Sequence, residues 1–249
     1  PAYQMLRSLV GSEMCIRDRY AQVIFFYSIF GFQRVGDMIW TCGDMMCRGF
    51  LIGGTAGRTT LNGEGIQHQD GHSQLIAKTF PDLKSYDPAF AYELVVIVRE
   101  GIHRMYELQE NIFYYITAYN ENYEMPSMPE KEDAQEGILA GAYHYQSTES
   151  EESSQVHLLG SGSIMQQVLA AKEKLEAMGL EVSVWSVTSY NELYREAEEC
   201  DRHNRLYPFD TETVSYTNLR DHETPEHRLR RVLPEKKKAG GGGGRGGGG

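Results

Sequence analysis

The feature that most constrains the fold is an alternation of strand-like and helix-like segments in residues 156–203. VHLLGSGS predicts a strand that ends in a glycine-serine turn, and MQQVLAAKEKLEAMGL then follows the 3.6-residue period of an amphipathic helix. A second strand, EVSVWSVTS, leads into a second helix, YNELYREAEECDRH. Strands that alternate with helices in this way build α/β folds, so we expect an α/β protein.

The preceding part of the chain extends the same pattern. Residues 88–107 predict a helix, and NIFYYITAYN predicts a buried strand because it is rich in β-branched and aromatic side chains. A short strand is expected within LIAKTFPDLKSYDP. Residues 20–52 are apolar on nearly all helical faces and favour one buried helix that ends at Gly53 and Gly54. Residues 128–154 are polar and acidic and indicate a boundary between two units.

A glycine-rich loop, residues 53–73, is the first candidate for an active site. It holds six glycines and few packing groups, so a core does not explain it. Four titratable residues fall within nine positions of it: Glu64, His68, Asp70 and His72. A histidine with a nearby acid suits proton transfer near neutral pH. An ordinary surface loop explains the composition about equally well.

Two local ligand motifs are weaker. His68 and His72 are four residues apart, as in a metal-binding HxxxH pair, but the glycines around them oppose the helix that such a pair needs. The GSGS turn at residues 160–163 resembles a phosphate cradle, yet it lacks the GxGxxG pattern, and a plain strand-to-helix turn is favoured. We therefore predict no metal site on this chain.

Charge and cysteine content exclude several classes of protein. The net charge of −11, with basic residues gathered near the end of the chain, argues against a general nucleic-acid role. Four cysteines without a CxxC pair favour a reducing compartment, and structural zinc is not expected. No apolar run has the length of a membrane helix and no secretory signal is visible, so a cytoplasmic protein without membrane contact is expected.

Both ends differ from the middle of the chain. Residues 1–19 contain SLVGSEMCIRDR, which resembles translated sequencing adapter, and residues 214–249 combine a similar segment with a basic cluster and a glycine run. We expect both ends to be non-native. The basic cluster is therefore discounted as a binding site.

The middle of the chain closely resembles the homodimeric bacterial type of pyruvate dehydrogenase E1 component. Long strings carry the resemblance: FFYSIFGFQRVGDMIW, RGFLIGGTAGRTTLNGEGIQHQDGHS, SYDPAFAYELVVIV, QENIFYYITAYNENYEMPSMPE and LLGSGSI. It implies a transketolase-like α/β fold. Residues 20–128 would be the later part of the pyrimidine-binding domain, and residues 129–213 the first part of the transketolase C-terminal domain.

The resemblance also implies a chemistry and a site. Family members use thiamine diphosphate and Mg²⁺ to decarboxylate pyruvate and to acetylate the lipoyl group of the E2 acyltransferase. Spacing alone favours core packing for Tyr27 and Phe30, whereas the resemblance places them in the pocket around the aminopyrimidine ring of the cofactor. It implies catalytic roles for Glu64 and His68, facing the substrate, with Asp70 and His72 supporting the loop.

The chain also departs from this family. The GDG motif that binds the diphosphate and Mg²⁺ is absent, so a C-terminal fragment that is inactive alone is expected. Two alternatives stay open: another thiamine-diphosphate enzyme, such as a transketolase or other 2-oxo acid dehydrogenase, and a non-catalytic interaction fragment. The homodimer would belong to the intact parent enzyme.

Overall fold

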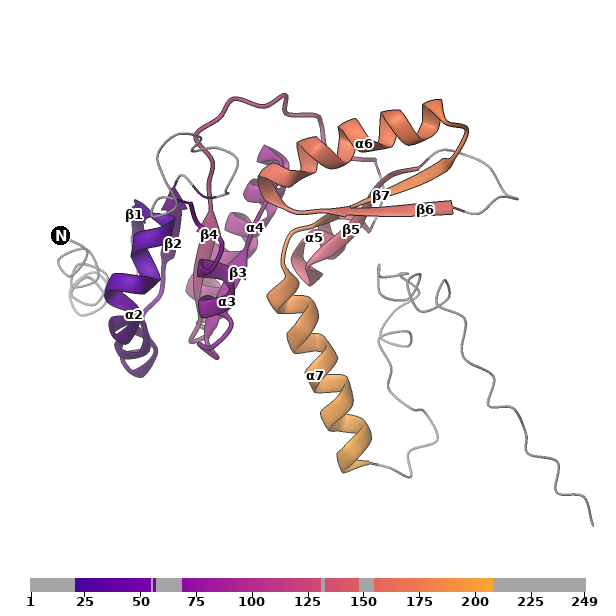
Figure 1. Ribbon diagram of the computed structural model, residues 1–249. Coiled ribbons are helices and arrows are strands. Elements are labelled where there is room, and N and C mark those ends of the chain that lie inside the picture. Colours follow the sequence, from indigo (N-terminus) through magenta and orange to yellow (C-terminus); the bar gives the residue numbers. More distant parts are fainter. Residues whose placement is uncertain (1–20, 55, 57–68, 131–132, 148–154, 208–249) are drawn as a thin grey trace, which may run out of the picture.

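The computed structural model describes residues 21–54, 56, 69–130, 133–147 and 155–207. The first sheet has four strands and the second has three. In Figure 1 the two sheets lie beside each other, helix α6 lies along the second sheet, and the far end of helix α7 projects beyond both. The strands alternate with helices along the chain. The expected α/β class is therefore confirmed.

The first sheet is wholly parallel and has the order β1-β2-β4-β3. Its strands are β1 (Val23–Tyr27), β2 (Phe50–Gly54), β3 (Leu83–Tyr86) and β4 (Phe113–Thr117). The register pairs Leu51 of β2 with Ile24 on one side and Tyr115 on the other. These three side chains share one core cluster, because paired residues of neighbouring strands face the same side of the sheet.

Helices cover both faces of the first sheet. Helices α2 (Ser28–Asp44) and α3 (Ser73–Ala77) lie on the face of Leu51 and Tyr115. Helix α4 (Ala91–Ile102) continues into a π-helical turn, η2 (His103–Glu107), and lies on the opposite face, where α5 (Ala134–Ala140) joins it. Helix α2 is kinked at Val35, whose φ of −135° is not helical. The sheet is therefore the middle layer of a three-layer unit.

The second sheet is mixed and has the order β5-β7-β6. Strand β6 (Gln155–Gly160) is parallel to β7 (Glu181–Val187), and β5 (Ala142–Ser147) is antiparallel to it. A 3₁₀ turn, η3 (Gly162–Ile164), leads into α6 (Met165–Ala177). The core under α6 is formed by Met165, Val182 and Val184. Ala89 and Phe90 of the first unit pack into the same core.

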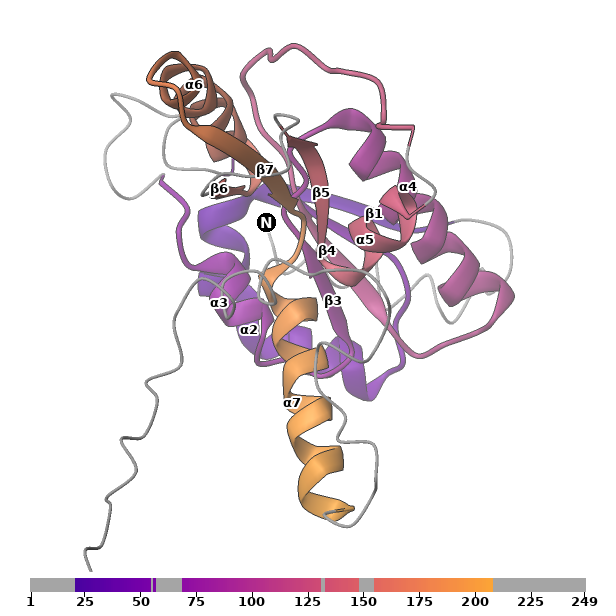
Figure 2. The same cartoon turned by 90° about the vertical axis from the view of Figure 1, so that its right-hand side faces the viewer.

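Helix α7 (Tyr190–Leu206) belongs to the second unit in sequence but docks on the first. The Ser189 hydroxyl donates to the Ser85 carbonyl at 2.6 Å, and the Asn191 side chain donates to the Ser85 hydroxyl at 2.6 Å. Figure 2 shows α7 lying beside β3 and then projecting beyond it. The outer edge of the first sheet is therefore covered by a helix that lies more than 100 residues later in the chain.

Two expectations about local structure are wrong. Residues 20–52 hold strand, helix and strand (β1, α2 and β2) rather than one buried helix. Strands of parallel sheets can be apolar on both faces, so VIFFY and FLIGG lack the alternation that marks a strand. Residues 128–154 are also not merely a polar boundary, because α5 and β5 lie within them.

The other expected elements are confirmed: the helix in 88–107, the strands at β3 and β4, and the series β6, α6, β7, α7. Helix α3 was not expected. Within the described residues, no helix is long and apolar enough to span a bilayer.

Candidate functional site

The carboxyl edge of the first sheet is the candidate site. All four strands are parallel, so their last residues, Tyr27, Gly54, Tyr86 and Thr117, lie along the same edge. Ligands of open α/β sheets bind outside this edge. The loop that follows β2 leaves the sheet there, and its residues 57–68 lie outside the described part of the chain. Glu64 and His68 are therefore not placed.

Tyr27 and Phe30 form an aromatic pair at this edge. Tyr27 ends β1, and its side chain is on the same face as Phe25, where it is 55% exposed. Phe30 lies in the first turn of α2, and the two ring centroids are 6.3 Å apart. The Arg34 guanidinium lies 4.2 Å from the centroid of the Phe30 ring, a cation–π distance. Because its side chain is more than half exposed, Tyr27 is not the packed core residue that spacing favours.

Asp70 and His72 occupy different environments. Asp70 is 7% exposed, and its carboxylate accepts hydrogen bonds from the backbone amides of His72 and Ser73, each at 3.1 Å. These bonds satisfy amides at the start of α3, as a capping carboxylate does. His72 is exposed and its side chain makes no capping hydrogen bond. Asp70 thus holds the end of the loop to α3.

A second group at the carboxyl edge is centred on Asp87, the first residue after β3. Its carboxylate accepts hydrogen bonds from the hydroxyls of Thr117, Tyr119 and Ser161, the last at 2.8 Å. Thr117 ends β4, and Ser161 follows β6 in the second unit. Burial and the adjacent Asp87 carboxylate raise the pKa of Tyr119 well above its usual value.

The backbone around Asp87 joins the units as well. The Asp87 amide donates to the Thr188 carbonyl at 2.7 Å, and the Gly162 amide donates to the Asp87 carbonyl at 3.2 Å. Gly162 has φ of +52°, and a Cβ there would collide with the Tyr119 hydroxyl. Glycine is therefore required both by the left-handed backbone and by the close approach. The GSGS turn is a contact between units rather than an open phosphate cradle.

Sequence reasoning missed this Asp87 cluster. The sequence pattern predicts only a short strand before Asp87 and a helix over residues 88–107, and it gives Asp87 no role. The only signal was the position of Asp87 directly after a strand, and the partner hydroxyls are 30 to 74 residues away. No local pattern joins residues at such separations.

A buried carboxylate next to the edge ties α4 to the second sheet. Glu93 is 0% exposed and accepts from the amides of Ala89 and Phe90, at 2.5 and 3.1 Å. It also accepts from the hydroxyls of Tyr143 and Ser186, each at 2.6 Å. Burial raises the pKa of Glu93 above its usual range, while these hydrogen bonds oppose the shift.

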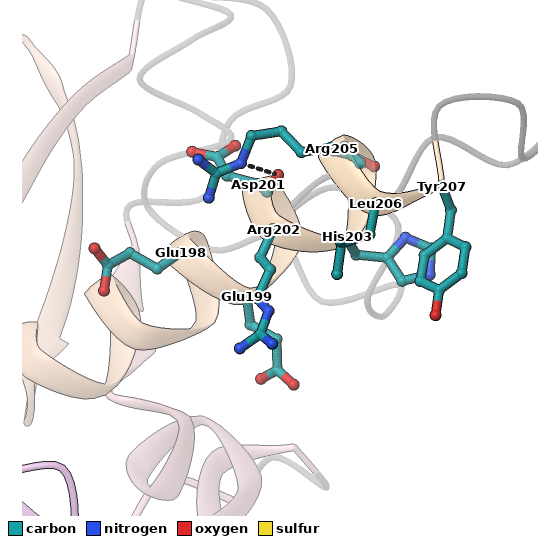
Figure 3. A pocket seen from close by; sticks show the side chains of 9 residues that line it. Glu198, Glu199, Asp201, Arg202, His203, Arg205, Leu206 and Tyr207 are labelled. Carbon is teal, nitrogen blue, oxygen red and sulfur yellow. Dashed lines mark hydrogen bonds between the residues drawn. The ribbon is translucent and has the colours of Figure 1, made fainter.

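One open cavity lies away from this edge, at the end of α7. Figure 3 shows its lining side chains, among them Glu198, Arg202, His203 and Tyr207, which point in different directions rather than toward one centre. The drawn hydrogen bond joins Arg205 Nε to the Asp201 carbonyl at 3.3 Å within the helix. Among the described residues, no three His, Cys, Asp or Glu side chains are grouped to hold a metal ion. We assign no chemistry to this cavity.

Comparison with protein families identifies both units. The family described as pyruvate dehydrogenase E1 component middle domain matches residues 17–126. The family described as transketolase-like TK C-terminal domain matches residues 141–238.

Curated relatives agree over most of the chain. The pyruvate dehydrogenase E1 component of Escherichia coli (strain K12) is 54% identical over 193 residues, which cover 77% of this chain and 21% of the relative. The pyruvate dehydrogenase E1 component of Pseudomonas aeruginosa is 54% identical over 192 residues, which cover 77% of this chain and 22% of the relative. The chain thus spans about a fifth of the length of these relatives.

Solved structures share the fold at lower identity. Transketolase from Leishmania mexicana superposes with a TM-score of 0.63 at 16% identity, covering 81% of this chain and 28% of that one. Transketolase from Campylobacter jejuni superposes with a TM-score of 0.57 at 19% identity, and the match covers 72% of this chain and 26% of the transketolase chain. These structures show a transketolase-like fold. The two family matches and the identity to the curated relatives show that the chain belongs to the bacterial pyruvate dehydrogenase E1 component family, of whose members it spans about a fifth.

Proposed function

We propose that this chain supplies one side of the thiamine diphosphate site of a pyruvate dehydrogenase E1. That enzyme decarboxylates pyruvate and transfers the acetyl group to the lipoyl group of the E2 acyltransferase. The observation that carries the proposal is the aromatic pair Tyr27 and Phe30 at the carboxyl edge of a parallel sheet. The E1 identity of the relatives supports the choice of substrate.

The described residues fit part of the cofactor. Two aromatic rings, one of them half exposed, suit the flat aminopyrimidine ring, which stacks on apolar and aromatic surfaces. They do not fit Mg²⁺, because no three His, Cys, Asp or Glu side chains are grouped among the described residues. We therefore assign ring binding to Tyr27 and Phe30 and no metal step to this chain.

The residues of the 53–73 loop would act on the substrate side. When bound, thiamine diphosphate supplies the carbanion that attacks the keto carbon of a 2-oxo acid. Negative charge then develops on the substrate, and a nearby proton donor stabilises it. We propose His68 as that donor and Glu64 as its catalytic partner. Asp70 fixes the end of the loop through the amides at the start of α3, with His72 beside it.

The domain limits and partners are part of the same proposal. Residues 20–128 would be the later part of the pyrimidine-binding domain and residues 129–213 the first part of the C-terminal domain. Pyruvate, the lipoyl domain of E2 and a second E1 subunit would be partners of the complete enzyme. The chain alone would have no turnover, because the GDG motif that binds the diphosphate and its metal is absent from its sequence.

A chimera tests the proposal. The 193 matched residues of the Escherichia coli E1 component would be replaced by the corresponding residues of this chain. Pyruvate-dependent acetyl transfer that requires thiamine diphosphate is expected in the chimera. An inactive chimera that is folded and dimeric would contradict the proposal.

Single substitutions in the chimera test the assigned roles. His68→Ala is expected to lower kcat about 100-fold or more, the usual contribution of an acid–base residue. Phe30→Ala is expected to weaken cofactor binding and so raise the cofactor concentration needed for half-maximal rate. His103→Ala is the matched control, since the His103 side chain is 44% exposed and pairs with Glu107 of the same turn, away from the carboxyl edge.

A further inference from the structure

Helix α2 ends in a hydrogen-bonded turn that brings two cysteines together. The Met46 amide donates to the Gly43 carbonyl and the Cys47 amide donates to the Cys42 carbonyl, each at 2.9 Å. Met46 has φ of +53°. This pair of bonds around a left-handed residue is the Schellman motif, in which the residues at the positions of Cys42 and Cys47 contact each other through their side chains.

The two thiols meet inside the protein. Cys42 is 0% exposed and Cys47 is 1% exposed, and both lie in the core cluster between α2 and the first sheet. Their side chains are hydrogen-bonded to each other. Disulfides form between residues whose backbones approach closely and whose Cβ atoms point together. The turn brings the two backbones close, and the hydrogen bond between the two thiols shows that the side chains point toward each other.

We propose that Cys42 and Cys47 are a dithiol site that a small disulfide, of the glutathione disulfide class, converts into an intramolecular disulfide. The thiolate of Cys47 attacks one sulfur of the small disulfide, forms a mixed disulfide and releases one thiolate. The thiolate of Cys42 then attacks the Cys47 sulfur, closes the Cys42–Cys47 bond and releases the second thiolate. The protein loses two electrons and two protons, and the small disulfide is reduced to two thiols.

Cys47 is the first of the two to react because of its place in the chain. It lies beyond the end of α2, next to Met45 and Met46, which are 42% and 58% exposed. Helix ends open locally at lower free energy than helix centres. The hydrogen bond to Cys47 and burial raise the pKa of Cys42 well above its usual value. Oxidation therefore proceeds through opening of the helix end and is slow compared with an exposed thiol.

The disulfide would fix the connection between α2 and β2. Phe50, the first residue of β2, follows Cys47 by three positions, and Arg48 already donates to the Gln109 carbonyl at 2.8 Å. A crosslink across the turn removes conformations from the unfolded chain and holds Met46 in its left-handed conformation. By linkage, the free energy by which the disulfide stabilises the native fold equals the free energy by which folding favours the disulfide over the dithiol.

Thiol–disulfide equilibration of the full 249-residue chain tests the site. The chain would be held in glutathione buffers of graded redox ratio, quenched with acid, alkylated and digested with trypsin. Residues 35–48 form one tryptic peptide that carries both cysteines and no internal Lys or Arg. A closed disulfide leaves this peptide two hydrogens lighter with no alkyl group, whereas the dithiol carries two alkyl groups.

The expected result compares folded and unfolded chain. The effective concentration of the two thiols is the equilibrium constant for forming the Cys42–Cys47 disulfide with glutathione as the redox partner. It should be at least tenfold higher in buffer than in concentrated urea, because the turn holds the two thiols together. Equal or lower values in buffer, or a peptide that keeps two alkyl groups in oxidising buffer, would overturn the proposal. So would a dominant pairing of either cysteine with Cys200.

Matched variants separate this turn from general thiol reactivity. Met46→Gly keeps the left-handed turn and should retain the high effective concentration. Met46→Val disfavours that backbone conformation and should lower it toward the value in urea. A chain carrying both Cys15→Ser and Cys200→Ser should oxidise like the original.

Discussion

At the scale of single residues, two carboxylates join the two units. Asp87 collects three hydroxyl donors from β4, from the segment after it and from the turn after β6. Glu93 collects two amides and two hydroxyls while wholly buried. A buried acceptor of this kind leaves several donors unsatisfied if it is removed, which costs more than the hydrogen bonds themselves contribute.

Glu93→Gln is expected to remove a pH dependence of stability. Burial raises the pKa of Glu93 above the ordinary value of 4.5, so the folded state holds the proton more tightly than the unfolded state. The contribution of the protonated Glu93 carboxyl to the free energy of unfolding is fully present below pH 4.5. This contribution is lost as the pH rises through the raised pKa of the folded state. A glutamine at this position cannot ionise, and its amide can still accept from the two backbone amides and donate to the two hydroxyls.

Urea unfolding across the mildly acidic to neutral pH range measures this effect. The original chain should lose stability across the range relative to the Glu93→Gln variant. Glu173→Gln, an exposed position on α6, should leave the pH dependence unchanged. Parallel curves for the original chain and the Glu93→Gln variant would contradict the assignment.

Met46→Gly is expected to stabilise the chain by about 1 kcal/mol. Met46 is a non-glycine residue with φ of +53°, a conformation that costs L-residues about 1–2 kcal/mol. Met45, beside it, has φ of −88°, so Met45→Gly should destabilise by about 0.5–1 kcal/mol because glycine only adds freedom to the unfolded chain. The measurement is the urea midpoint of both variants under reducing conditions. Shifts of the same sign would refute the argument.

At the scale of elements, α7 is held to the first sheet by polar contacts. Arg195 donates to the carbonyls of Phe80 and Leu83, at 2.7 and 2.9 Å, and pairs with Glu192 at 2.7 Å. Glu192 also pairs with Lys84 of β3 at 2.5 Å. The helix therefore closes the outer edge of the sheet, which would otherwise present unpaired backbone groups.

Arg195→Ala is expected to destabilise the chain by about 2 kcal/mol. It removes two hydrogen bonds to backbone carbonyls and leaves Glu192 paired with Lys84. Arg202→Ala, on an exposed position of the same helix, should change stability by less than about 0.5 kcal/mol. Thermal unfolding of both variants gives the comparison, and equal losses would show that α7 does not dock through Arg195.

The elements also show what sequence patterns can and cannot predict. Helices α4, α6 and α7 were predicted correctly because each carries a regular apolar stripe. Strand β1 was predicted as helix because its five residues are all apolar or aromatic. In the structure Ile24 is buried, whereas Val23 and Phe25 on the other face are exposed. The face a residue occupies depends on which helix covers the sheet, and no local pattern contains that information.

At the scale of the whole molecule, one face of the first sheet is incompletely covered. Helix α4 packs over β2 and β4, and the side chains of β1 on that face stay exposed, at 48% for Val23 and 66% for Phe25. Strand β1 is also the last strand of the described sheet on that side. An exposed apolar edge strand promotes association between chains.

Phe25→Lys is expected to reduce self-association with little change in stability. The substitution places a charge on an exposed edge strand and removes an apolar side chain that buries little area. Sedimentation velocity at several concentrations measures the effect. As a control, Leu51→Lys should unfold the chain, because Leu51 is 0% exposed in the centre of the sheet. Unchanged association of the Phe25→Lys variant would show that another surface carries it.

The sequence by itself determined the α/β class, the helices with regular apolar stripes and the resemblance to pyruvate dehydrogenase E1. These properties depend on local periodicity and on long matching strings. The glycine-rich loop stays a prediction, because its residues 57–68 lie outside the described part of the chain. Only the tertiary structure placed Tyr27 at the carboxyl edge of the sheet, gathered three hydroxyls on Asp87 and buried Glu93 between the units. The physical reason is distance along the chain: the hydroxyl donors to Asp87 and Glu93 lie 30 to 93 positions away from them, and these hydrogen bonds form only once the sheets have packed together.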